Sequence, residues 1–230
     1  MNNEIIARAG KRKHKKKITK IVKLVLLFFT LLLLILYIVV RVIYNNGNFS
    51  ITLDRNLYLE NNIVIYDDSN YKVFRTELYA PIVESFDNIS YKWLPEDIDN
   101  FEGGSHNGDN YVAYTFYIEN LGDTPSDYWS EIIIDDVIKN LDEAVRIRVY
   151  KNGNYITYAK ASSNGNPEKE TVAFETDTLI AHEHVVDFKP GDKNKYTIVL
   201  WLEGTDPECT DNILGGEIKI HMDFNSEFVG

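Results

Sequence analysis

The sequence predicts a mainly β protein: a single N-terminal transmembrane helix followed by an antiparallel β-sandwich of the jelly-roll or immunoglobulin-like kind. Three observations lead to this fold class. A long uncharged apolar run lies near the N-terminus, the chain after it alternates apolar and polar residues, and turn-forming residues separate the alternating runs. We therefore expect a basic cytoplasmic tail over 1–20, a transmembrane signal-anchor helix over 21–44 and an extracytoplasmic β-sandwich domain over 45–230.

Charge is divided unevenly between these parts. Of the 24 basic and 35 acidic residues, ten basic and one acidic lie within 1–41, so the remainder carries a net charge of −20. Nucleic-acid binding needs a cationic surface, and the acidic part of the chain therefore argues against nucleic acid as a partner. The negative charge suits solubility, cation binding or a basic partner such as a cationic cell-wall polymer.

The basic tail contains a dense cluster of six cationic side chains: Lys11, Arg12, Lys13, Lys15, Lys16 and Lys17. Such a run also occurs in nuclear signals and RNA-binding patches. Directly before a membrane helix, it is more simply explained by membrane topology and by attraction to anionic lipids, worth roughly 1 kcal/mol per charge. We therefore expect membrane lipids as partners of the tail.

The apolar run at 24–40 contains no charged residue. A helix over 21–44 would span ~36 Å, enough for a hydrocarbon layer of ~30 Å. No small-x-small cleavage site follows the run, so the helix is expected to be retained rather than removed as a signal peptide. Because loops rich in Lys and Arg stay in the cytoplasm, the N-terminus is expected there and the C-terminal domain outside the cell.

Four segments after the helix alternate as strands with one buried face do: 49–54, 111–119, 196–202 and 217–224. In the third, Tyr196, Ile198 and Leu200 share one face, while Val199 and Trp201 lie on the other. Weaker strand signals lie at 62–66, 73–79, 128–134, 170–176 and 179–188. A short helical turn anchored by Leu141 is expected within 137–144.

A hairpin is the clearest local unit. Strands at 145–150 and 155–160 flank the Asn-Gly pair at 152–153, which is the favoured pair for a two-residue type I′ turn. This register places Val149 opposite Ile156 and Ile147 opposite Tyr158, all on one face.

Two histidines on one predicted strand, His182 and His184, form a candidate metal pair. Residues two apart share a face of a strand, so both imidazoles could hold one metal ion. The same face would carry Ile180, Val186 and Phe188 toward the core. The alternative is that both are ordinary histidines on a half-buried strand, since no third ligand is identifiable from the sequence.

An acidic loop provides a second candidate site, with four carboxylates that suit a cation such as Ca²⁺: Glu203, Asp206, Glu208 and Asp211. The spacing differs from that of an EF-hand. The alternative is a tight connection in which these side chains cap backbone amides. Cys209 lies in the same loop and is the single cysteine, which excludes an internal disulfide and leaves an intermolecular one open.

Two stretches, 110–122 and 195–224, resemble the C-terminal β-sandwich halves of TasA/camelysin-like exported surface proteins of Gram-positive bacteria. The resemblance covers about a third of the chain. It implies a jelly-roll-like domain on a bacterial surface that contributes to an extracellular matrix or to adhesion. The chain differs from that family in its retained anchor and long basic tail, and no zinc-protease motif is present, so no catalytic residue is carried over.

Together these patterns predict a membrane-anchored bacterial surface protein with a non-enzymatic β-sandwich domain for contacts with extracellular protein or cell-wall polymer. The sequence contains no nucleophile elbow, P-loop or dinucleotide-binding fingerprint. Exposed edge strands would permit self-assembly by strand addition. Two alternatives stay open: a metal-dependent hydrolase using His182 and His184, and an accessory subunit of an envelope complex.

Overall fold

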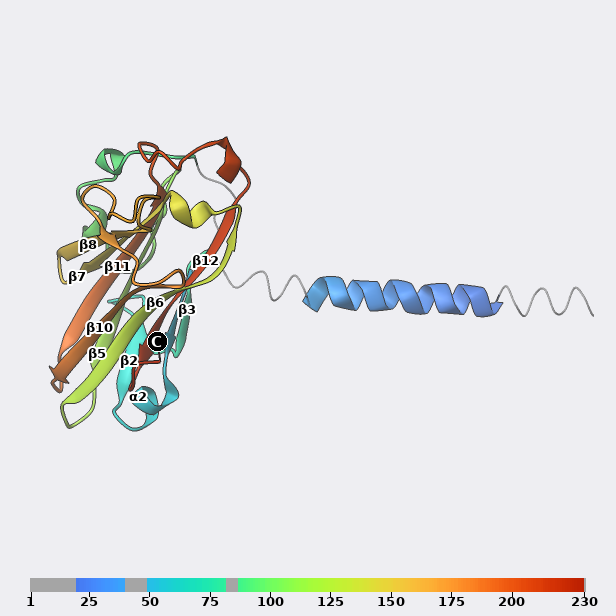
Figure 1. Cartoon of the computed structure of the whole chain (residues 1–230). Coiled ribbons are helices and arrows are strands. Elements are labelled where there is room, and N and C mark those ends of the chain that lie inside the picture. The colour runs from blue at the N-terminus through green and yellow to red at the C-terminus, as the bar shows by residue number, and fades with distance from the viewer. Residues whose placement is uncertain (1–19, 40–48, 82–86, 230) are drawn as a thin grey trace, which may run out of the picture. The chain divides into compact units, whose positions relative to one another are not determined.

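The structure, a computed structural model, describes residues 20–39, 49–81 and 87–229 (Figure 1). Contacts between Cα atoms divide the chain into two compact units, Met1–Asn45 and Asn46–Gly230. The first contains the N-terminal helix and the second contains a mainly β domain. The six cationic residues of the tail, Lys11 to Lys17, lie outside the described residues.

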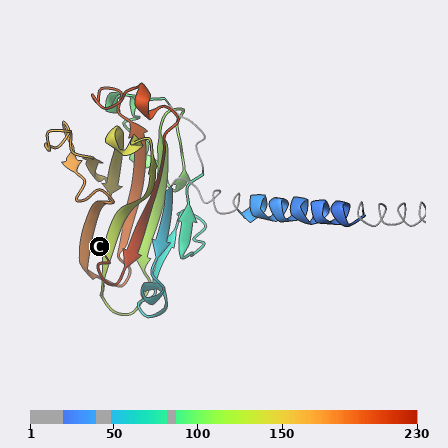
Figure 2. The same cartoon turned by 45° about the vertical axis from the view of Figure 1, so that its right-hand side comes forward.

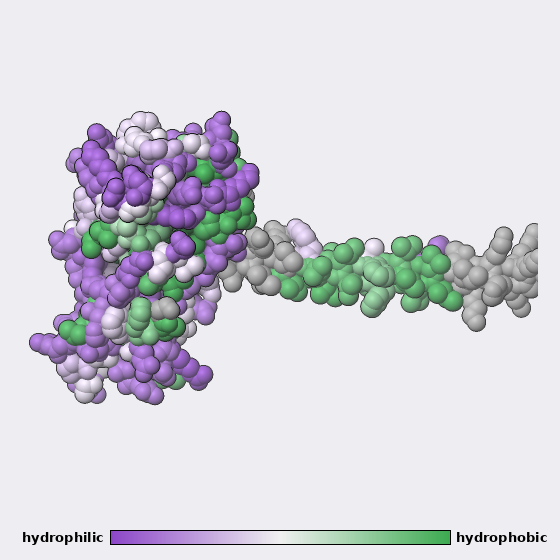
Figure 3. All heavy atoms as spheres, viewed as in Figure 1, coloured by the Kyte–Doolittle hydropathy of each residue, from purple (hydrophilic) through white to green (hydrophobic). Residues whose placement is uncertain are grey.

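The N-terminal helix is long and apolar enough to cross a membrane. It runs over Lys20–Val39, 20 residues, and an 18-residue window within it has a mean hydropathy of 2.9 with none of its side chains buried. At 1.5 Å per residue such a helix measures ~30 Å, the thickness of a bilayer's hydrocarbon layer. Figure 3 shows apolar side chains along its length. The last five residues of the predicted span, 40–44, lie outside the described residues.

A five-stranded sheet forms one layer of the domain, with the order β10-β6-β12-β1-β3. Its strands are β1 (Phe49–Leu53), β3 (Glu77–Tyr79), β6 (Ser126–Ile138), β10 (Leu179–Phe188) and β12 (Glu217–Asn225). Figure 2 shows this order from the orange β10 to the teal β3. The four longer strands correspond to predicted strands at 49–54, 128–134, 179–188 and 217–224.

A second sheet forms the other layer, with the order β2-β5-β11-β7-β8-β9 and with β4 paired to β5. Its strands are β2 (Ile63–Tyr66), β4 (Gly104–Ser105), β5 (Val112–Asn120), β7 (Val145–Lys151), β8 (Asn154–Ala159), β9 (Val172–Ala173) and β11 (Lys193–Leu202).

The predicted mainly β fold after one N-terminal helix is confirmed, and both sheets are mixed because each contains one parallel pair among antiparallel ones. β1 runs parallel to β12, and β8 runs parallel to β9. Parallel neighbours need a long connection between them. The β1–β12 pair joins strands from opposite ends of the domain sequence, and the whole domain separates them.

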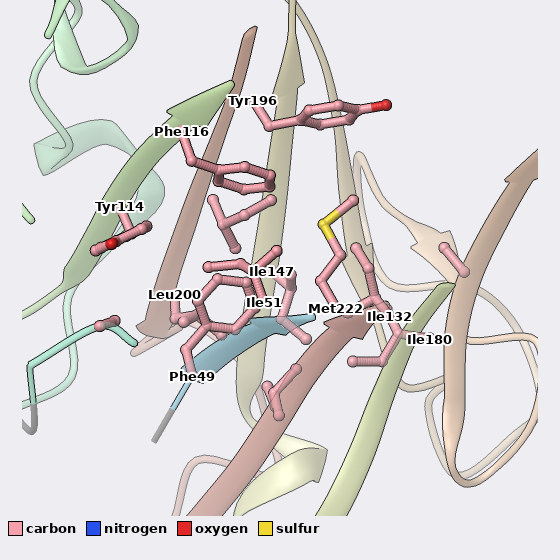
Figure 4. Packing of buried hydrophobic residues seen from close by; sticks show 14 of the residues in the cluster. Phe49, Ile51, Tyr114, Phe116, Ile132, Ile147, Ile180, Tyr196, Leu200 and Met222 are labelled. Carbon is pink, nitrogen blue, oxygen red and sulfur yellow. The ribbon is translucent and has the colours of Figure 1, made fainter. Parts of the chain in front are cut away.

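The main core lies between the two layers. Alternation along each strand directs one set of side chains inward, as predicted for Tyr196, Ile198 and Leu200. In Figure 4 the rings of Phe116 and Tyr196 lie near Met222 from the opposite sheet. The Phe116 and Tyr196 rings are stacked, with 5.4 Å between their centroids.

A second apolar cluster covers the outer face of the seven-stranded sheet. Val199 and Trp201, on the outward face of β11, pack with Ile89, Leu94 and Ile98 from the connection before β4. Two short 3-10 turns, η1 (Tyr91–Trp93) and η2 (Ile98–Asn100), shape that connection. β11 is therefore buried on both faces, and this is why its predicted outer residues are also apolar.

The predicted hairpin is confirmed in its register. Val149 pairs with Ile156 and Ile147 pairs with Tyr158. Residues 152–153 both have positive φ, 51° for the Asn and 85° for the Gly, as a type I′ turn requires.

Several weaker predictions were wrong in extent. Strand structure covers only Glu77–Tyr79 of 73–79 and only Val172–Ala173 of 170–176. The helical turn within 137–144 shrinks to Leu141–Glu143 (η3), because β6 continues to Ile138. A short helix that was not predicted, α2 (Arg55–Leu59), follows β1 where Asp54 accepts a hydrogen bond from the Asn56 amide.

Candidate functional site

A pocket of about 470 Å³ lies on the outer face of the seven-stranded sheet. Alternation along β7 sends Arg146 and Arg148 to this face, while Ile147 between them enters the main core. Neighbouring strands add Tyr155 and Trp201 to the floor, and three loops complete the wall with residues 90–92, 168–171 and 203–206.

A group of carboxylates lies at one end of this pocket. One oxygen from each of Glu168, Asp206 and Glu208 lies within 4.8 Å of the others. Asp206 is buried and forms an ion pair with Arg146, whose guanidinium is also 3.9 Å from Glu168. Of the four residues predicted from the acidic loop, the structure thus brings two together and adds Glu168, which sequence reasoning missed because it comes from a different loop.

Glu203 has a structural role within the same loop. Its carboxylate accepts hydrogen bonds from the Tyr91 amide at 2.9 Å, the Trp201 indole at 3.1 Å and the Thr205 hydroxyl at 2.7 Å. The side chain therefore ties three segments together, which matches the alternative that the sequence left open. Asp211 is exposed at the start of the 3-10 turn Asp211–Ile213 and lies outside the carboxylate group.

The carboxylate group is a poor match to the needs of Ca²⁺. A hydrogen bond with Asp206, followed by burial, raises the pKa of the Glu208 carboxyl above its usual value. Ca²⁺ takes about six to eight oxygen ligands, and Arg146 already neutralises part of the negative charge here. Calcium binding in this loop stays a prediction.

His182 and His184 lie on the outer side of β10, not on the core side. Two β-bulges, between Leu179 and Ala181 and between Val185 and Phe188, shift the register of β10 against β6. Each bulge reverses which residues face inward. His182 and His184 share one face, as predicted, and it is the outer face of the sheet, where Val186 is also exposed. Ile180 and Phe188 instead reach the core, so their predicted place on the same face was wrong.

The two imidazoles have partners of their own. His182 Nδ1 lies 2.6 Å from Glu175 Oε2, and the ring of His184 stacks on Trp129 with 4.1 Å between centroids. Within 20–39, 49–81 and 87–229, neither histidine belongs to a group of three or more ligand side chains that could hold a metal. A metal role for this pair stays a prediction.

A second pocket, of about 480 Å³, opens between the sheets beside β8 and the edge strand β10. Met222, Tyr196 and Ile132 line it from the core, and Tyr158 of β8 and His182 of β10 also contribute to its lining. It is distinct from the pocket around Arg148, although Tyr155 contributes to both.

Cys209 is half-buried beside the carboxylate group. Burial, together with the charges of Asp206 and Glu203, raises the pKa of its thiol above the usual value. A thiol held in the protonated form is a weak nucleophile. The intermolecular disulfide stays a prediction.

A scan against protein-family models gives no match, and neither does a search of curated proteins. Among solved structures, the chain is similar to a β-glucosidase from Kluyveromyces marxianus in complex with glucose, with 12% identity and a TM-score of 0.25 over 70% of this chain and 15% of that chain. It is also similar to the GH31 α-xylosidase from Xanthomonas citri, with 11% identity and a TM-score of 0.24 over 71% and 16% of the two chains. Similarity at this level does not indicate a shared function.

Proposed function

We propose that this chain is a bacterial surface protein held in the cell membrane by one helix, with its N-terminus in the cytoplasm and its β domain outside. The apolar helix Lys20–Val39 supports membrane insertion. The basic residues before it favour a cytoplasmic N-terminus. The β domain in this proposal is a non-enzymatic binding module for extracellular protein or cell-wall polymer, as in adhesion, matrix or envelope assembly.

The pocket around Arg148 is the observation that carries the binding role. Its lining combines aromatic rings, hydroxyl groups and charged groups, which are the side chains that orient a polar ligand. The hydroxyls of Thr171 and Thr205 donate to Glu168 O and to the Glu203 carboxylate. Hydroxyl groups engaged in this way hold loops together, and this favours binding over nucleophilic catalysis.

Cysteine labelling in living cells tests the proposed topology. Cys209 is the single cysteine, so a Cys209→Ser background allows one new cysteine to be placed at will. Asp123→Cys places it on an exposed turn of the β domain, and Asn3→Cys places it in the tail as the matched control. A membrane-impermeant maleimide should label Asp123→Cys in intact cells and Asn3→Cys only after permeabilisation. Equal protection of both positions in intact cells would contradict the proposal.

Self-assembly is part of the same proposal and has its own support. β10 is an edge strand of the five-stranded sheet, and Val186 on it is 60% exposed. A free edge can pair with a strand of another chain. Light scattering of the detergent-solubilised chain, with and without Ca²⁺, should show assemblies larger than the monomer. A monomer at all concentrations in both conditions would remove self-assembly from the proposal.

A further inference from the structure

The guanidinium of Arg148 is held firmly by neutral groups. It lies 4.4 Å from the ring centroid of Tyr155 and 5.2 Å from that of Trp201. Its Nε donates to the Thr157 hydroxyl at 2.9 Å, and its Nη1 donates to the Tyr150 hydroxyl at 3.4 Å. The side chain is therefore fixed in one position on the pocket floor.

Arg148 also has no anionic partner in the described part of the chain. No carboxylate oxygen among those residues lies within 4.0 Å of its nitrogens, although the domain is rich in acids. Its neighbour on the same strand face, Arg146, is paired with Asp206 and lies near Glu168. A half-buried charge normally has a partner, because partial loss of hydration otherwise costs free energy. The two aromatic rings offset only part of that cost.

The other charged groups of the pocket leave Arg148 available. Glu203 is occupied by its backbone, indole and hydroxyl donors, and Asp206 is occupied by Arg146. Lys169 and Glu170 lie 3.9 Å apart at the exposed rim, where water screens the pair. Lys92 adds a further positive charge to the wall. Glu168, the remaining acid of the lining, lies 3.9 Å from Arg146. Within the described residues, Arg148 and Lys92 are therefore the basic side chains of the lining that have no carboxylate partner.

The geometry points to this pocket as a binding site for a carboxylate or phosphate group carried on a sugar or polyol unit. This inference rests on the proposed function, since it names the ligand class of the same module. The planar guanidinium of Arg148 can donate two parallel hydrogen bonds to such an anion. Tyr155, which is 57% exposed, offers a flat ring against which a sugar can lie. A volume of about 470 Å³ holds one or two such units.

The charge of the surrounding domain restricts the ligand. The chain beyond residue 41 carries a net charge of −20, which repels a dense polyanion such as nucleic acid. A single anionic group on an otherwise neutral unit avoids most of that repulsion. Carboxylated sugars and polyol phosphates share this chemistry, and the experiment has to separate them.

Calorimetric titration of the detergent-solubilised full chain tests the inference. The probes are glucuronate, glycerol phosphate and glucose as the neutral control. One or both anions should bind, and glucose should not. Whichever of glucuronate and glycerol phosphate binds more tightly identifies the preferred anionic group as carboxylate or phosphate. Arg148→Met should weaken anion binding about 10- to 100-fold, since charge-assisted hydrogen bonds are lost. Arg55→Met, which removes an exposed arginine of α2, should leave the affinity unchanged.

Arg148→Lys provides the second variant, because it keeps the charge and removes the planar fork. If Arg148→Met does not fold, Arg148→Lys still tests the inference, and it should bind the anions more weakly than the wild type does. Binding of both anions by Arg148→Lys with wild-type affinity, or no binding of either anion by the wild type, would overturn the inference. Either result is compatible with labelling of Asp123→Cys from outside the cell. The ligand inference would then fail while the proposed surface location stands. A cytoplasmic domain that still bound the anions would instead contradict the location alone.

Discussion

His221 should make the stability of the β domain depend on pH. It lies on β12, on the outer face of the five-stranded sheet, with Nδ1 2.8 Å from Asp135 and Nε2 3.3 Å from Asp223. The hydrogen bond to Asp223 is the largest cause of a raised pKa of the imidazole, and Asp135 raises this pKa further. Together they outweigh burial, which lowers it, and the pKa is about 9. The folded domain thus holds a proton that the unfolded chain releases near neutral pH.

The size of the effect follows from the two pKa values. Raising the pKa from its ordinary 6.5 to about 9 favours the folded state by about 3 kcal/mol, at ~1.4 kcal/mol for each tenfold change in proton affinity. The side chain is 20% exposed, so this is an upper limit. Because the folded state binds the proton more tightly than the unfolded chain does, the full stabilisation of the folded domain is present below pH 6.5. This stabilisation is lost as the pH rises through about 9.

Urea unfolding of the wild type and His221→Gln at pH 6 and pH 10, followed by tryptophan fluorescence, measures this contribution. From pH 6 to pH 10 the free energy of unfolding should fall by up to about 3 kcal/mol more in the wild type than in the variant. Asp223→Asn should reduce the difference, because it removes the stronger partner. Equal losses in the wild type and in His221→Gln would refute the reasoning.

Three further substitutions probe the hairpin, the buried ion pair and the core, each by urea unfolding. Gly153→Ala should lower the free energy of unfolding by about 1 kcal/mol through backbone strain alone, because Gly153 has φ 85° and open space around it. An unchanged free energy of unfolding would contradict the type I′ turn. Arg146→Met should cost about 3–5 kcal/mol, because it leaves Asp206 buried without its partner, and Asp206→Asn added to it should restore part of the loss. Phe116→Ala should cost about 3–5 kcal/mol through the cavity it leaves between the sheets; a loss below 1 kcal/mol would mean that the layers do not pack there.

Local patterns in the sequence predicted much of the fold. The hairpin register follows from the Asn-Gly pair and the alternation on either side of it, and both act over a few residues. β12 was predicted well for the same reason, since its inward and outward residues alternate throughout. The two faces of β11 were also identified, although the layer that covers Val199 and Trp201 was not.

The wrong predictions share a non-local cause. The bulges of β10 arise in its pairing with β6, so period-two counting put His182 and His184 on one face correctly but wrongly placed Ile180 and Phe188 there with them. Glu168 joins Asp206 only because two loops distant in the sequence meet beside β7. The candidate pocket could not be predicted for the same reason, because its lining comes from three strands and three loops.

Protease treatment of intact cells tests the central claim most directly. A chain tagged at both ends should lose its C-terminal tag when protease is added outside. The N-terminal tag should remain on a membrane-bound fragment that alkaline carbonate does not extract. A C-terminal tag that survives until the cells are lysed, or a full-length chain that washes from the membrane without detergent, would contradict an anchored domain facing outward.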